Sequence, residues 1–261
     1  MNIIEKINKT RYTLKEVFSE TKIYNDKYPE GIQEWKTDGI ADLSDEEIER
    51  MYNVPASSDA ELEMGKAVGC NFSIEHNLIS GYYLHVIYYG FNEIDKPSKV
   101  TKSFQKKIYN LYENEIFNKH DSVLIIVNDE ISESIQKILL EININNVKLI
   151  DDIPSSFKAN MKEHEYYLEA KHFRNYHMFY VNELINNLLN HELVPKHVVY
   201  RCNKEKNKIL ENCNCKLNQL PIIKFNDAIS KLIRLAPDDI CEIIRTSKKC
   251  GEYPFYRVCK Y

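Results

Sequence analysis

The sequence has few of the residues that build phosphate-binding loops. Glycine occurs only 7 times in 261 residues, and neither G-x-x-x-x-G-K-[ST] nor G-x-G-x-x-G is present. The metalloprotease pattern H-E-x-x-H and the serine-hydrolase pattern G-x-S-x-G are also missing. The 8 histidines are scattered along the chain. We therefore expect no active site, metal or cofactor in this chain.

The sequence also lacks long apolar runs. No run approaches the roughly 18 apolar residues of a membrane-spanning helix. The N-terminus, MNIIEKINKTRY, is charged every few residues and has no apolar signal core. These features predict a protein with neither a membrane span nor a secretion signal.

Cysteine is concentrated near the C-terminus. Of 7 cysteines, 6 lie in the last sixty residues. The odd number and the missing signal favour a reducing compartment. Cys213 and Cys215 are separated by one residue, which is not a usual zinc-knuckle spacing. Cys241 and Cys259 fall within apolar strand patterns, where cysteine behaves as a small hydrophobic residue.

Charge is divided unevenly along the chain. Residues 193–261 carry 14 Lys/Arg against 7 Asp/Glu, a net +7, whereas residues 1–192 carry 21 against 32, a net −11. A basic end on an acidic body indicates that this end meets an acidic partner, either protein or nucleic acid. A solvated basic face explains the same numbers equally well.

The first 190 residues alternate between helix and strand patterns. Helices are expected over 3–19, 45–52 behind a capping box at Ser44 and Glu47, 101–117 and 132–142, with a charged connection at 96–102. Strands are expected over 82–90, 122–127, 147–150 and 176–181. This rhythm predicts the α/β (α+β) class, with a mixed sheet flanked by helices.

The last seventy residues predict a smaller α/β unit. Its first strand is HELVPKHVV, from His191 to Val199, with Pro195 near the start, where a missing N–H is tolerated. The elements expected next are a helix at 203–212, a strand at 220–223, a helix capped by Asn226 or Asp227 and ending at Leu235, and strands at 240–245 and 255–260 joined by a loop at 248–251.

The order of short motifs in this unit resembles the C-terminal assembly domain of the fifth subunit of eukaryotic nuclear RNA polymerases, which has a small archaeal polymerase subunit as its counterpart. The motifs are HELVPKHVV from 191, QLP at 219–221, Asn226-Asp227, IIR at 243–245, Ser247, G-x-Y at 251–253 and YRV at 256–258. The resemblance is close over about 176–261 and looser over about 82–150. Residues 1–80 carry little of it.

The resemblance implies a non-catalytic subunit of a DNA-directed RNA polymerase that supports DNA-templated transcription. Residues 1–185 would form a jaw domain, with an acidic insertion at about 38–68, and residues 186–261 the assembly domain. The assembly domain would dock on the largest subunit among other polymerase subunits, and the jaw would lie near downstream DNA. The protein would come from a eukaryotic cell and act in the nucleus, or from a large DNA virus and act in the virion or the cytoplasmic viral factory.

The resemblance also implies which residues act. The docking residues would be Leu193, Pro195, Lys196, His197, Leu220, Pro221, Arg245, Tyr256 and Arg257. The apolar members also read as core, whereas charged heads are rarely buried without a partner. The DNA-proximal turn of the family corresponds to Ser132, Glu133 and Ser134, with an acid in place of the usual proline.

Two other classes of function remain open. A free-standing nucleic-acid-binding module would use the basic C-terminal end and would bind DNA or RNA in a salt-dependent way. A thiol or zinc protein would contain bound metal when purified.

Overall fold

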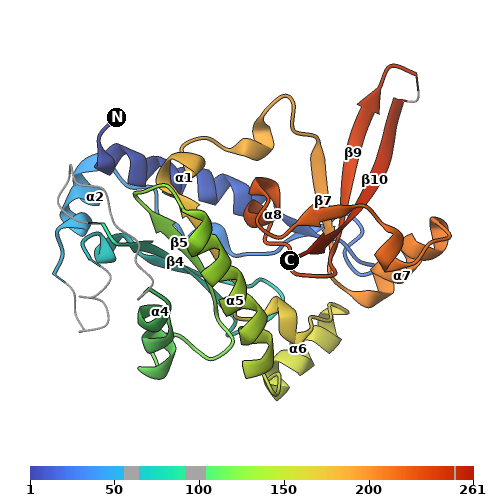
Figure 1. Ribbon diagram of the computed structural model, residues 1–261, viewed down its shortest axis with the longest axis horizontal. Helices are drawn as coiled ribbons and strands as arrows, with labels where there is room; N and C mark the ends of the chain where they lie inside the picture. The colour runs from blue at the N-terminus through green and yellow to red at the C-terminus, as the bar shows by residue number, and fades with distance from the viewer. Residues whose placement is uncertain (56–64, 92–103, 250) are drawn as a thin grey trace.

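The computed structural model describes residues 1–55, 65–91, 104–249 and 251–261. Its strands form two four-stranded sheets, in the orders β3-β4-β5-β6 and β7-β9-β10-β8, and a two-stranded sheet of β1 (Lys22–Ile23) and β2 (Ile32–Gln33). Helices pack against both larger sheets (Figure 1). The predicted α/β (α+β) class is confirmed. No helix among these residues is long and apolar enough to cross a membrane.

The first sheet is mixed, as predicted. Its strands are β3 (Phe72–Glu75), β4 (Tyr83–Tyr89), β5 (Ser122–Val127) and β6 (Tyr176–Tyr180). β3 runs antiparallel to β4, whereas β4, β5 and β6 run parallel. All six residues of β5 are buried, which confirms the reading of SVLIIV as a central strand. β3 was not expected from the sequence.

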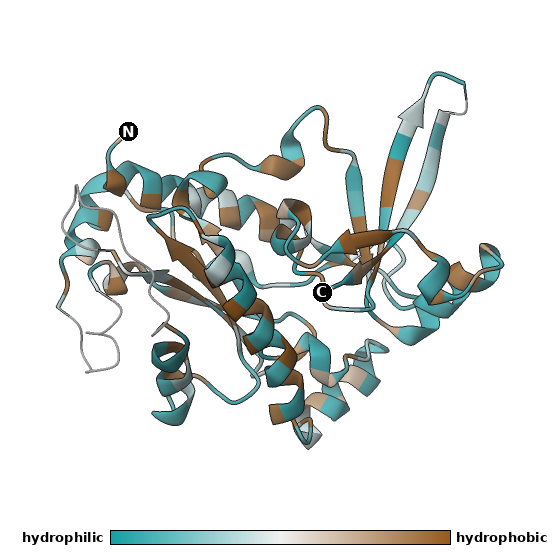
Figure 2. Cartoon of the chain, in the orientation of Figure 1, coloured by the Kyte–Doolittle hydropathy of each residue, from teal (hydrophilic) through white to brown (hydrophobic). Residues whose placement is uncertain are grey.

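Helices cover both faces of this sheet. Among the described part of the first 190 residues, the α-helices are α1 (Ile3–Glu20), α2 (Asp45–Tyr52), α4 (Phe104–Glu113), α5 (Glu133–Leu149) and α6 (Ser155–His164). Leu124 and Ile126 of β5 pack in one core with α1 and α2. Val123 and Ile125 pack in a second core with α4 and α5. Figure 2 shows the corresponding apolar colouring of β4 and β5.

The predicted capping box is present at the start of α2. Glu47 N–H donates to Ser44 Oγ at 3.3 Å, and Ser44 N–H donates to the Glu47 carboxylate at 2.8 Å. Both orphan donors are satisfied, so the helix begins at Asp45 and ends at Tyr52, as expected. Residues 56–64 of the predicted acidic insertion and the predicted connection at 96–102 lie outside the described residues.

The strand predicted at 147–150 is wrong, because these residues continue α5 to Leu149. Two buried asparagines hold this helix against the sheet. Asn143 Nδ2 donates to the Tyr176 carbonyl at 3.0 Å, and Asn146 Nδ2 donates to the Arg174 carbonyl at 3.0 Å. These tertiary contacts override the strand preference of a short Val-Lys-Leu-Ile run.

The second sheet is built from the C-terminal residues. Its elements are β7 (Lys196–Tyr200), α7 (Asn203–Asn212), β8 (Ile222–Lys224), α8 (Ala228–Leu232), β9 (Ile240–Ser247) and β10 (Gly251–Lys260). β10 pairs antiparallel with β9 and parallel with β8, and β9 pairs antiparallel with β7. Asp227 caps α8 as predicted. The helix stops before the predicted Leu235, and Arg234 has a left-handed φ of 54°.

Candidate docking surface

Strands β9 and β10 form a hairpin that projects beyond its neighbours (Figure 1). β7 pairs with β9 only from Ile240 to Ile244, and β8 pairs with β10 only from Val258 to Lys260. The outer part of the hairpin, 245–247 with 251–257, is therefore paired only with itself among the described residues. This part carries several of the predicted docking residues.

One face of the hairpin presents two arginines around one aromatic ring. The guanidinium carbons of Arg245 and Arg257 lie 4.6 and 5.4 Å from the centroid of the half-buried Phe255 ring. Tyr253, 39% exposed, follows on the same side of β10 because side chains alternate along a strand. We call Arg245, Tyr253, Phe255 and Arg257 the arginine face.

The arginine face is electrostatically open. Neither arginine has a carboxylate oxygen within 4.0 Å among the described residues, although exposed and half-buried arginines readily pair with acids. Arg257 donates from Nη1 to the Ile222 carbonyl at 3.2 Å, which directs it toward β8. The face can therefore accept a carboxylate from a partner without first breaking an internal ion pair.

The opposite face of the hairpin is part of a core. Tyr256 Oη and Tyr200 Oη donate to the Glu242 carboxylate at 3.1 and 2.8 Å. Burial and the Glu242 charge raise the pKa of Tyr256 to about 12. Leu220 is 9% exposed and packs with Val258 in the same cluster. Leu220 and Tyr256 thus have structural roles here.

The remaining predicted docking residues lie around β7 and β8. Pro195, Lys196 and His197 line a groove of about 480 Å³ against the end of α1 and β1. His197 Nδ1 lies 2.6 Å from the Pro195 carbonyl oxygen, and burial, with Arg245 and Arg257 nearby, lowers the pKa of His197. Leu193 is 83% exposed in the turn before β7.

Pro221 is exposed, and its carbonyl oxygen accepts from Val258 N–H at 2.9 Å. The structure thus gathers Arg245 and Arg257, with His197 beside them on the same sheet. It does not gather all nine predicted residues into one patch.

The predicted DNA-proximal residues lie at the start of α5, on the first sheet. Ser132, Glu133 and Ser134 are all exposed. The Ser132 and Ser134 hydroxyls lie 3.0 Å apart, and the Ser132 hydroxyl makes no capping bond to the helix. The loop offers hydroxyl groups together with one negative charge.

A buried ion network joins the two sheets, and the sequence did not indicate it. Arg201 donates from Nε and Nη2 to Glu34 at 3.0 and 3.1 Å, and from Nη1 to Asp239 at 2.8 Å. His172 Nε2 lies 2.8 Å from the other Asp239 oxygen. Burial opposes the charge of Asp239, but His172 and Arg201 outweigh it and lower its pKa to about 2. Glu34 and Arg201 are 167 residues apart, so no local signal could have paired them.

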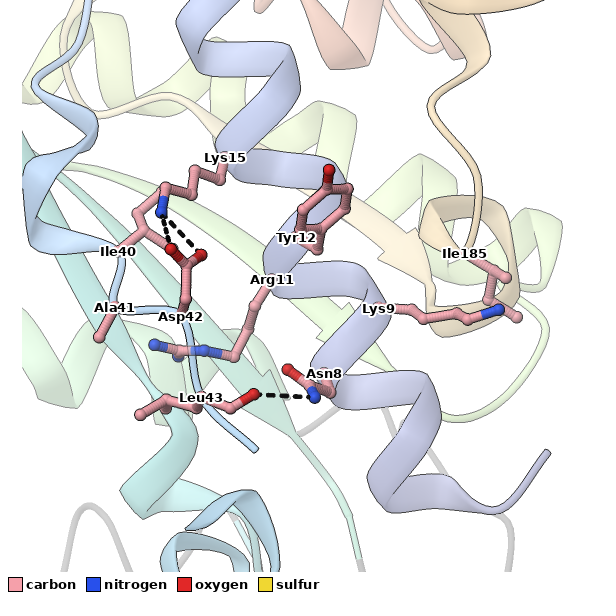
Figure 3. Close-up of a pocket in the computed structure, with 10 residues that line it drawn as sticks. All are labelled: Asn8, Lys9, Arg11, Tyr12, Lys15, Ile40, Ala41, Asp42, Leu43 and Ile185. Atoms are coloured by element: carbon pink, nitrogen blue, oxygen red, sulfur yellow. Dashed lines mark hydrogen bonds and ion pairs between the residues drawn. The ribbon is translucent and has the colours of Figure 1, made fainter. Parts of the chain in front are cut away.

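A separate pocket of about 330 Å³ lies along α1, between residues 40–43 and Ile185 (Figure 3). Lys15 Nζ pairs with Asp42 at 2.7 Å across its wall, and Asn8 Nδ2 donates to the Leu43 carbonyl at 3.0 Å. Arg11, 4% exposed, donates to the Cys70 carbonyl at 2.8 Å and lies 4.6 Å from the centroid of Phe72. These contacts tie α1 to residues 40–43 and β3.

The cysteines of the strands are buried, as predicted for Cys241 and Cys259. Burial raises the pKa of the Cys241 thiol to about 12. In the part of the chain that the structure describes, no three His, Cys, Asp or Glu side chains are placed to hold a metal ion.

Comparison with known proteins identifies the C-terminal part of the chain. Residues 186–259 match the family described as RNA polymerase Rpb5, C-terminal domain. Over 67 residues, 26% of this chain and 79% of the relative, the chain is 46% identical to DNA-directed RNA polymerase subunit Rpo5 of Sulfurisphaera tokodaii. Over 71 residues, 27% of this chain and 77% of the relative, it is 44% identical to Rpo5 of Staphylothermus marinus.

A eukaryotic relative matches a similar length of chain. Over 77 residues, 30% of this chain, the sequence is 36% identical to DNA-directed RNA polymerases I, II, and III subunit rpabc1 of Dictyostelium discoideum. The matched part spans 39% of that relative. All three relatives are cellular proteins, and they lend no support to a viral source.

Proposed function

Because the chain belongs to the RNA polymerase subunit 5 family, we propose that it is a non-catalytic subunit of a DNA-directed RNA polymerase. The match over residues 186–259 is the observation that carries this proposal. The chain supports transcription by holding other subunits in place. Nucleotide addition and its metal ions belong to the large subunits of the complex.

In this proposal the C-terminal domain, residues 186–261, docks on the largest subunit. The arginine face supports this role, because Arg245 and Arg257 lack acidic partners within the described chain. The exposed Leu193 and the groove beside Lys196 offer a second contact area on the same domain. Interface arginines and aromatic residues contribute disproportionately to binding energy.

The N-terminal domain, residues 1–185, is proposed as the jaw near downstream DNA. Its exposed Ser132 and Ser134 are available to phosphate groups, whereas Glu133 repels them. The jaw would therefore approach DNA without binding it tightly. From a eukaryotic cell, the complex would act in the nucleus; a viral source, which the relatives do not support, would place it in the virion or the cytoplasmic viral factory.

The proposal is tested by recovering partners of the tagged full-length chain from native extract and identifying them by mass spectrometry. We expect the large polymerase subunits to be recovered with the wild-type chain and to be depleted with the Arg245→Gln/Arg257→Gln variant. Lys249→Gln, an exposed change at the hairpin tip, is the matched control. Failure of the wild-type chain to recover any polymerase subunit would refute the proposal.

The alternative is a free-standing nucleic-acid-binding module, favoured by the net charge of +7 over residues 193–261. The structure offers it little stacking surface, because the Phe255 ring is half-buried and two guanidinium groups lie beside it. Nucleic-acid affinity of the purified chain with a steep salt dependence, and no polymerase subunit in the pull-down, would favour this alternative.

A further inference from the structure

The outer edge of β10 is an unpaired strand edge. β10 spans ten residues but pairs with β8 over only its last three, Val258 to Lys260. From Gly251 to Arg257, no described strand lies on that side. An exposed strand edge of this length presents a row of backbone donors and acceptors.

The hydrogen bonds at the base of β10 show which residues face this edge. Val258 N–H donates outward to the Pro221 carbonyl at 2.9 Å, whereas Cys259 N–H donates to the Asp239 carbonyl, on the β9 side, at 2.9 Å. Even-numbered residues therefore point their backbone groups away from β9. The register with β9 is continuous from 251 to 258, so the same phase holds along the hairpin.

Glu252, Pro254 and Tyr256 thus present their backbone groups to the open edge. Pro254 has no N–H, and a proline in a sheet is tolerated where its nitrogen faces solvent. Pro254 is an even-numbered residue whose nitrogen points away from β9, which agrees with an edge that β8 does not pair with at this position. The edge offers the N–H groups of Glu252 and Tyr256 and the carbonyls of all three residues.

The side chains beside this edge differ between the two faces of the hairpin. Arg257, Phe255 and Tyr253 lie on the arginine face, and Arg257 leans toward the edge through its bond to the Ile222 carbonyl. Pro254 and Tyr256 lie on the other face. A strand laid on this edge would meet Arg257 on one side, and Pro254, Tyr256 and the Glu252 carboxylate on the other.

We infer that the β10 edge accepts an extended acidic segment of a partner protein, which adds a fifth strand to the C-terminal sheet. The segment carries Asp or Glu at alternate positions on the arginine face, opposite Arg257 at the edge and toward Arg245, which lies on β9 across β10, and apolar residues between them. This inference deepens the proposed docking role and rests on it. Backbone pairing supplies affinity, and the alternating side chains supply specificity.

A peptide fits this site better than a nucleic acid does. Phosphate oxygens of a nucleic acid can accept from the N–H groups of a strand edge, but a DNA backbone has no donor for the carbonyl groups that alternate with them. Base stacking also needs several free aromatic faces, and the arginine face offers only the exposed Tyr253, because the Phe255 ring is half-buried beside Arg245 and Arg257. The positive charge of the arginine face and the unpaired backbone groups of the β10 edge therefore both favour an acidic peptide strand.

The test begins with the full-length chain in its native complex. Tyr253 is replaced by the photoreactive amino acid p-benzoylphenylalanine, the purified complex is irradiated, and the cross-linked segment is sequenced by mass spectrometry. We expect a protein segment with acidic residues at alternate positions. A synthetic peptide of that segment is then titrated against the purified full-length chain by fluorescence anisotropy.

Backbone methylation of the peptide distinguishes strand addition from simple charge attraction. Methylation of those alternate amides whose N–H groups face β10 should weaken binding roughly tenfold or more, because it removes these donors. Methylation in the other phase should leave affinity within about twofold. Arg257→Gln should also weaken binding roughly tenfold, whereas Lys249→Gln should not.

Three results would overturn the inference: a cross-link to nucleic acid, equal effects of methylation in both phases, or an intact complex in which Tyr253 cross-links to nothing. In each of these cases the chain is still recovered with polymerase subunits, so the proposed function survives. If no polymerase subunit is recovered at all, the proposed function fails and this inference fails with it.

Discussion

The buried Asp239 carboxylate provides the sharpest test of how the two sheets are held together. Its pKa is lowered from 3.8 to about 2, and each unit corresponds to about 1.4 kcal/mol. The ionised carboxylate therefore stabilises the fold by about 2 kcal/mol at neutral pH. Because the folded-state pKa is the lower one, this stabilisation is complete above pH 4 and is lost as pH falls toward 2.

Asp239→Asn should lower the free energy of unfolding by about 2 to 3 kcal/mol at pH 7. The change removes one of the two carboxylates on Arg201 and the charged partner of His172. Breaking a buried pair typically costs roughly 3–5 kcal/mol. We expect a loss at or just below the bottom of that range, because Glu34 continues to hold Arg201 through two hydrogen bonds.

The measurement is urea-induced unfolding of the wild type and the variant from pH 2 to pH 7. Asp238→Asn is the matched control, because Asp238 is 38% exposed and pairs with Lys260 and Lys171 at the surface. That control should lose less than about 1 kcal/mol. A loss below about 1 kcal/mol in Asp239→Asn, or unchanged pH dependence below pH 4, would refute the reasoning.

Three further predictions concern a buried histidine, a tightly packed glycine and the cysteines. Burial lowers the pKa of His76 from 6.5 to about 4, so the protein should lose about 3 kcal/mol of stability as pH falls from 6.5 to 4. In His76→Gln, the free energy of unfolding measured in urea should vary less with pH over this interval. Gly69→Ala places a Cβ 2.3 Å from a carbonyl oxygen of α2 and should lower the stability measured by thermal unfolding by about 1–3 kcal/mol. Gly39→Ala, where the nearest atom is 3.4 Å away, should lose less stability; equal losses in the two variants would contradict the steric argument. Exposed Cys213 should react with Ellman's reagent in the native chain, and buried Cys241 only after unfolding; similar native rates would show that Cys241 is accessible.

The elements that were predictable have local causes. The capping box of Ser44 and Glu47 satisfies its donors within four residues, so sequence alone locates the start of α2. The apolar run of β5 likewise reports its own burial on both faces. In the C-terminal unit, the cap at Asp227 was predictable for the same reason. The strand predicted from His191 begins only at Lys196, because the residues up to Pro195 form a turn.

The elements that were missed depend on distant partners. Residues 147–149 stay helical because Asn143 and Asn146 bond to the backbone around β6, and a four-residue window cannot show this. β3 is a short edge strand whose pairing with β4 defines it. The Arg201 network likewise joins residues from four distant segments.

For the predicted docking residues, too, the sequence shows the local pattern but not the effect of distant packing. Motif resemblance selected Arg245, Arg257, Leu220 and Tyr256 together, without indicating their different environments. The strand register places the arginines on one face of the hairpin and Tyr256 on the other, where its hydroxyl group bonds Glu242. A pattern of alternate residues is visible in sequence, but the face that is buried is decided by packing against α7 and β8.

The outer hairpin carries residues that disfavour pairing between copies of the chain through its open strand edge. Pro254 removes a donor at the middle of the edge, and Glu252 places a charge beside it. Lys248 and Lys249 add like charges at the tip, so two hairpins repel one another when they approach edge to edge. An acidic segment meets attraction where a second copy meets repulsion. The basic residues Lys248, Lys249 and Arg257 would therefore oppose self-pairing and favour the acidic strand proposed for this edge, whereas Glu252 disfavours an acid directly opposite it.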